Sequence, residues 1–124
     1  MLCPRENPVS AYRRAAFDAR VRGAAPAELV MVCLEEVIDS LVHALAAESR
    51  GSLAAPVDWL GRAHAALVAL ELGVAPGTAL SAVLGTFYAA ARSEIVGSMT
   101  GFDRSRLSLV KADFVDIAEA MRTA

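Results

Sequence analysis

One stretch decides the fold: Leu29-Val30-Met31-Val32-Cys33-Leu34-Glu35-Glu36-Val37-Ile38-Asp39-Ser40-Leu41. Its apolar residues recur three and four positions apart on more than one side, which indicates a helix whose apolar surface is wider than a single stripe. The run is far shorter than the roughly 20 apolar residues that a membrane span needs. We therefore expect no stable membrane insertion, and we expect this helix to lie at the centre of the fold or to be covered from outside as well.

Helix breakers divide the remainder of the chain. Glycine and proline groups follow the arm at 23–26 and recur at 51–56, 73–77 and 97–101. The segments between them predict four helices, over 27–48, 55–72, 78–98 and 103–122. Pro56 fits the first turn of the second helix, where its missing N–H costs little. Asp103 or Ser105 can cap the fourth helix.

The apolar spacing supports these helices unequally. Three-and-four spacing is regular in the third helix, at Leu80, Val83, Leu84, Phe87, Tyr88, Ala91 and Ile95. It is also regular in the fourth, at Leu107, Val110, Phe114, Ile117 and Met121. The second helix is thinned by alanines. No run alternates with period two, so no sheet is predicted. Short connections favour an all-α, antiparallel up-and-down four-helix bundle, with residues 24–124 forming the bundle and 1–23 a mobile, partly helical N-terminal arm.

Composition points to a partner. Hydrophobic residues make up 56% of the 124 residues, above the roughly 45–50% that is usual, and much of the excess is alanine. Such a bundle tends to expose shallow apolar grooves. The arm places Val9, Tyr12, Ala16 and Phe17 on one side if it coils into a helix. It is basic on balance and the body is acidic, so the arm can dock on the body weakly and reversibly.

Several functional classes are disfavoured. Cys3 and Cys33 are isolated, which favours reduced thiols in the cytoplasm, and no secretory leader is visible. No metal-ligand spacing surrounds His43 or His64, so we expect no metal. There is no Gly-rich phosphate loop, and we expect no cofactor. The short basic arm and the absence of basic clusters in the body argue against nucleic-acid binding.

Two groups of residues raise a catalytic interpretation. The first is acid–base chemistry by the carboxylates of Glu35, Glu36 and Asp39, which precede His43. The favoured interpretation of this cluster is a solvated face with a contact between Asp39 and His43. His64 raises the alternative of a histidine phosphotransfer bundle. However, hydrophobic residues stand after His64 at the positions where phosphotransfer domains carry a lysine and a glycine. The simpler interpretation is that His64 is a half-buried histidine of an ordinary helix. We expect no enzyme activity.

Three segments between residues 7 and 45 share a pattern with a known family: Asn7-Pro8 followed by Tyr12, then Ala25-Pro26-x-x-Leu29-Val30, then Cys33-Leu34-Glu35-Glu36. They resemble, in this order, the Asn-Pro start, the Ser/Thr-Pro-x-x-Leu-Ile/Val segment and the Leu-Tyr-Asp/Glu-Gly box of the flagellin export chaperones, the FliS family. The last segment departs from the family's box at Leu34 and Glu36. The resemblance covers nearly the whole chain and is specific over about 7–45.

The resemblance implies a cytoplasmic chaperone that binds the disordered C-terminal segment of flagellin in apolar grooves. Such a chaperone prevents premature polymerisation and delivers flagellin to an export gate component of the flagellar secretion apparatus. A generic helical adaptor and a phosphotransfer protein remain as alternatives. A weak homodimer is a further possible assembly of the chain. The expected partner-binding residues are those of the arm and of the outer face of the first helix, although core packing is the default for each apolar residue. They are Asn7, Pro8, Val9, Tyr12, Phe17, Leu29, Val30, Cys33, Leu34, Val37 and Leu41.

Overall fold

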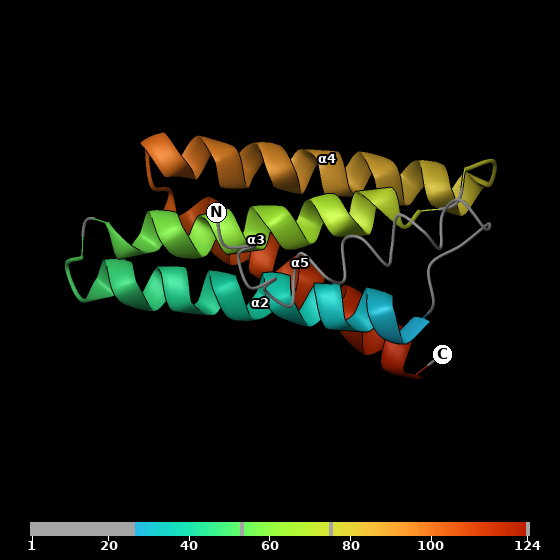
Figure 1. Cartoon of the computed structure of the whole chain (residues 1–124), viewed down its shortest axis with the longest axis horizontal. Helices are drawn as coiled ribbons and strands as arrows, with labels where there is room; N and C mark the ends of the chain where they lie inside the picture. The colour runs from blue at the N-terminus through green and yellow to red at the C-terminus, as the bar shows by residue number, and fades with distance from the viewer. Residues whose placement is uncertain (1–26, 53, 75, 124) are drawn as a thin grey trace, which may run out of the picture.

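The computed structural model describes residues 27–52, 54–74 and 76–123. These form four helices and no strand: α2 (Ala27–Ser49), α3 (Ala55–Leu72), α4 (Ala79–Thr100) and α5 (Arg104–Thr123), shown in Figure 1. The expected all-α four-helix bundle is confirmed, and the expected helix bounds hold to within two residues. The arm and its residues lie outside the described part of the chain.

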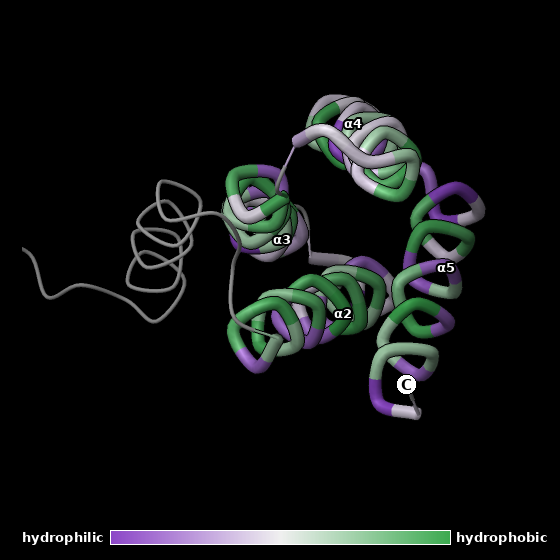
Figure 2. The backbone as a smooth tube through the Cα atoms, turned by 90° about the vertical axis from the view of Figure 1, so that its right-hand side faces the viewer, coloured by the Kyte–Doolittle hydropathy of each residue, from purple (hydrophilic) through white to green (hydrophobic). Residues whose placement is uncertain are grey.

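The helices follow one another around the bundle, and α5 closes the circle against α2. Figure 2 looks along the bundle and shows them in the order α2, α3, α4, α5. Ion pairs show that α2 and α5 are antiparallel. Arg122, near the end of α5, pairs with Glu35 in the first half of α2, while Arg104, at the start of α5, pairs with Glu48 near the end of α2.

Local sequence fixes where the helices begin. Pro56 lies in the first turn of α3, as expected. Thr78 and Ser81 form a capping box, in which the Thr78 hydroxyl accepts from the Ser81 amide at 3.0 Å and the Ser81 hydroxyl accepts from the Thr78 amide at 3.1 Å. Asp103 caps α5, because its carboxylate accepts from the Arg106 amide at 3.0 Å.

The core runs between all four helices. Its largest fully buried side chains include Leu34, Leu41, Leu60, Ile95 and Phe114. Three of the alanines that thin α3 (Ala63, Ala66 and Ala69) are buried, and α3 packs against α2 more extensively than any other pair of neighbours packs. Like every helix of this ring, α2 has two neighbours, α3 and α5, so it does not lie at the centre of the fold.

The first half of α4 is the exception to this packing. Its buried residues begin only in the third turn, at Tyr88, and continue with Ala91, Ile95 and Ser98. Leu80 and Val83, which belong to the same apolar pattern, remain 66% and 65% exposed. Helices α4 and α5 are also the neighbours with the least contact. Among the described residues, no helix is both long and apolar enough to cross a membrane.

Candidate functional site

An apolar cleft lies at the end of the bundle where α4 begins and α5 ends. It has a volume of about 530 Å³. Leucine side chains of α4 form one wall, and α5 supplies Ile117 and Met121 on the other. Val30 of α2 and Leu70 of α3 also line it. All four helices therefore contribute to one largely apolar recess.

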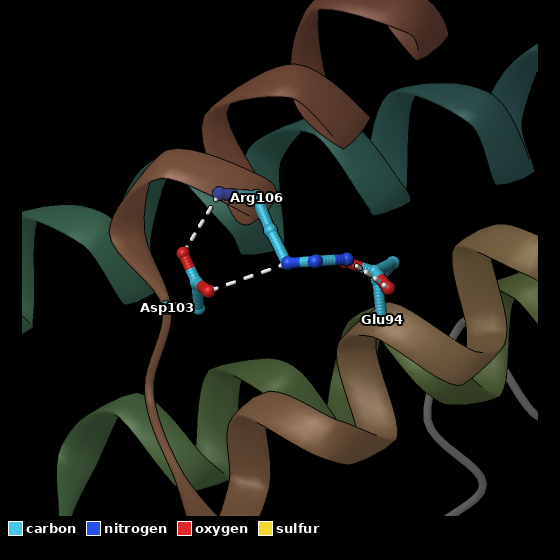
Figure 3. Close-up of polar contacts among 3 residues, drawn as sticks. All are labelled: Glu94, Asp103 and Arg106. Carbon is cyan, nitrogen blue, oxygen red and sulfur yellow. Dashed lines mark hydrogen bonds and ion pairs between the residues drawn. The ribbon is translucent and has the colours of Figure 1, made fainter.

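The cleft exists because α4 and α5 are joined closely only at the opposite end. There, Arg106 of α5 donates from Nη1 to both carboxylate oxygens of Glu94 on α4, at 3.1 and 3.2 Å. The Arg106 Nε also lies 3.5 Å from a carboxylate oxygen of Asp103, so one arginine connects the turn to both helices (Figure 3). Further along, Phe87 contacts Phe114, with ring centroids 5.0 Å apart. Beyond that contact, the first two turns of α4 are left largely uncovered.

The apolar surface continues from the cleft over the outer side of α4. Val83 and Phe87 line a shallower hollow there with Ala82 and Thr86. Leu80, Val83 and Phe87 are spaced by three and four residues, so they lie on one side of the helix. The cleft and this stripe together form an elongated apolar surface, which we call the α4–α5 groove.

Burial raises the pKa of two ionisable side chains, Tyr88 and its neighbour Cys33. Tyr88 lines the cleft, and its burial, followed by the nearby Cys33 thiol, raises its pKa to about 12. The pKa of Cys33 is raised to about 11, first by burial and then by Glu36. Neither group is charged near neutral pH, so they do not oppose the docking of an apolar ligand.

The structure redistributes the expected partner-binding residues. Cys33, Leu34, Val37 and Leu41 are at most 3% exposed, because α3 and α5 cover the sides of α2 that carry them. These four are core residues, and the expectation that they form an outer face of α2 is wrong.

Two further expected residues, Leu29 and Val30, are half-buried, and only Val30 lines the cleft. Asn7, Pro8, Val9, Tyr12 and Phe17 lie outside the described residues. The groove residues of α4 and α5 were predicted as apolar helix positions and not as binding residues, because their spacing is the same as that of core residues.

The acidic cluster of α2 is held in surface ion pairs. Glu35 lies 3.2 Å from Arg122, and Glu36 lies 3.2 Å from Arg62 of α3. His43 does contact Asp39, but its Nδ1 bonds the backbone carbonyl at 2.7 Å rather than the carboxylate.

The histidines are likewise placed as ordinary helix residues. The His43 ring stacks on Trp59, with centroids 4.3 Å apart, at the edge of the bundle. His64 is half-buried on α3, as expected for a histidine of an ordinary helix. Within the described ranges, no three side chains of the kinds that bind metals come together.

Comparison of the chain with protein-family models, curated proteins and solved structures gives no match. The case for a function therefore depends on the α4–α5 groove and on the sequence resemblance.

Proposed function

We propose that this protein binds an amphipathic helical segment of another protein in the α4–α5 groove, and that it acts as a cytoplasmic export chaperone for flagellin. One observation carries the proposal: an apolar cleft of about 530 Å³ continues into a stripe containing Leu80 and Val83, each about two-thirds exposed. Large apolar side chains that gather at a concave surface are typical of partner-binding sites.

The groove suits a helix better than a small ligand. An incoming amphipathic helix presents apolar residues at intervals of three and four, and these match the spacing of Leu80, Val83 and Phe87. A segment that is disordered before binding gains this apolar contact while it folds, and it can be released again afterwards. Those properties suit a chaperone that must give up its cargo at an export gate.

The choice of flagellin depends on the sequence resemblance to the FliS family. Under this proposal, the arm at 1–23 competes with cargo for the groove and leaves when cargo arrives. The apolar residues Val9, Tyr12 and Phe17 would cover the groove in the absence of cargo. Deleting residues 1–22 should then raise the affinity for cargo or promote self-association. An unchanged affinity in a monomeric deletion variant would count against the role of the arm.

Calorimetry with a synthetic C-terminal flagellin segment tests the proposal. We expect binding at tens of micromolar or tighter, with a negative heat-capacity change from apolar burial. The same protein should retain flagellin from a cell lysate. If the flagellin segment does not bind in this range, the flagellin assignment falls and a helical adaptor with another partner takes its place.

A further inference from the structure

The groove has an acidic edge on α5. Asp113 lies four residues before Ile117 and seven before Ala120, both of which line the cleft, so Asp113 shares their side of the helix. Asp116 lies four residues before Ala120 and flanks the same edge. Both aspartates are exposed.

No basic side chain in the described part of the chain pairs with this edge. Lys111, two residues before Asp113, falls on another side of α5. Among the described residues, neither Asp113 nor Asp116 forms an ion pair, whereas Arg122 is held by Glu35 and Arg92 of α4 by Glu71 at 2.8 Å. The balance of the whole body has the same sign, because residues 27–123 hold twelve aspartates and glutamates against seven lysines and arginines. The groove therefore combines an apolar floor with a negative rim.

We infer that the segment bound in the α4–α5 groove is a basic amphipathic helix whose lysines or arginines flank its apolar stripe and face Asp113 and Asp116. This inference depends on the proposed use of the groove and adds the chemistry of its partner. The apolar stripe supplies most of the affinity, and the acidic rim selects the charge and fixes the direction of the bound helix.

The electrostatic contribution is modest and has a characteristic salt dependence. Exposed ion pairs are individually weak, so losing two of them should weaken binding about fivefold. At 0.1 M salt, exposed charges more than about 10 Å apart are largely screened from each other. At higher salt concentrations, charges that lie closer together are screened as well. Affinity for a basic helix should therefore fall with salt, whereas the apolar part of the binding should persist.

Two synthetic peptides of about 18 residues, roughly 27 Å of helix, provide the probes. They share one apolar stripe and carry either lysine or glutamate along its flank. Fluorescence anisotropy with the full chain should show the lysine peptide binding at least tenfold more tightly than the glutamate peptide at low salt, and 0.5 M salt should reduce that difference.

The variant Asp113→Asn/Asp116→Asn should bind the lysine peptide about fivefold more weakly than the wild type. A matched control, Asp39→Asn/Glu119→Gln, removes two exposed charges that do not line the groove and should change binding less than twofold.

Equal binding of both peptides, or binding of neither, overturns the inference. So does an unchanged affinity of Asp113→Asn/Asp116→Asn. A groove closed by a second copy also overturns it, and sedimentation would detect this as a dimer that the lysine peptide cannot dissociate.

Binding of the flagellin segment distinguishes failure of the inference from failure of the proposed function. If only the lysine peptide binds, the flagellin assignment fails and the inference stands. If the flagellin segment binds the aspartate variant as tightly as the wild type while the two peptides do not differ, the inference fails and the flagellin assignment stands.

Discussion

Replacing Leu80 and Val83 by glutamine tests whether the exposed stripe of α4 binds a partner. Fully burying a leucine or valine side chain contributes about 1.5–3 kcal/mol. Because these two remain 66% and 65% exposed, about two-thirds of that gain, or about 1–2 kcal/mol each, is still available on binding. A factor of ten in Kd corresponds to about 1.4 kcal/mol, so Leu80→Gln/Val83→Gln should weaken binding of the flagellin segment about a hundredfold.

The same double variant should fold normally. Exposed positions usually change the free energy of unfolding by less than about 0.5 kcal/mol, and glutamine is nearly as good a helix former as leucine. Urea denaturation checks this, and calorimetry measures the affinity. The matched control is Val42→Gln/Val57→Gln, at sites 43% and 42% exposed that do not line the groove, and it should bind like the wild type. A folded Leu80→Gln/Val83→Gln protein with wild-type affinity would show that the exposed stripe of α4 does not bind the segment.

Three further predictions concern the body of the bundle. Ser40→Ala should raise the free energy of unfolding by about 1 kcal/mol in urea denaturation, because the buried Ser40 hydroxyl has no hydrogen-bond partner among the described residues. Stability should fall between pH 9 and pH 11: the pKa of Cys33 is about 11 in the fold against an ordinary value of 9.0, so the unfolded chain loses its proton first and is favoured as the pH rises. Denaturation across this range should show the decline, and Cys33→Ala should flatten it below pH 10, where Tyr88 does not yet contribute. Asp103→Ala should cost about 1 kcal/mol through loss of the α5 cap, whereas Asp103→Asn, which keeps an acceptor, should cost less by the same assay.

The helices could be predicted well from the sequence because the signals that start them are local. Pro56 and Asp103 act within one turn of their own positions, so their roles could be assigned without knowing the tertiary structure. The Thr78 capping box was harder to recognise, since Ser81 stands where the usual box has glutamate or glutamine.

The same sequence could not locate the groove. Leu80 and Val83 repeat the spacing of Leu107 and Val110, yet the first pair is exposed and the second is buried. Spacing identifies one side of a helix, but exposure depends on how closely the neighbouring helix approaches. The wrong assignment of Cys33, Leu34, Val37 and Leu41 to an outer face has the same origin. The helices on both sides of a wide apolar helix decide whether its apolar surface is exposed or covered.

An NMR titration of the ¹⁵N-labelled full chain with the flagellin C-terminal segment locates the binding surface directly. We expect the largest amide shifts in the first half of α4, at residues 79–88, and at 117–121 of α5, with little change around Trp59 on the α2–α3 side. Saturable binding whose shifts gather around Trp59 and His43, with α4 and α5 unaffected, would contradict this expectation.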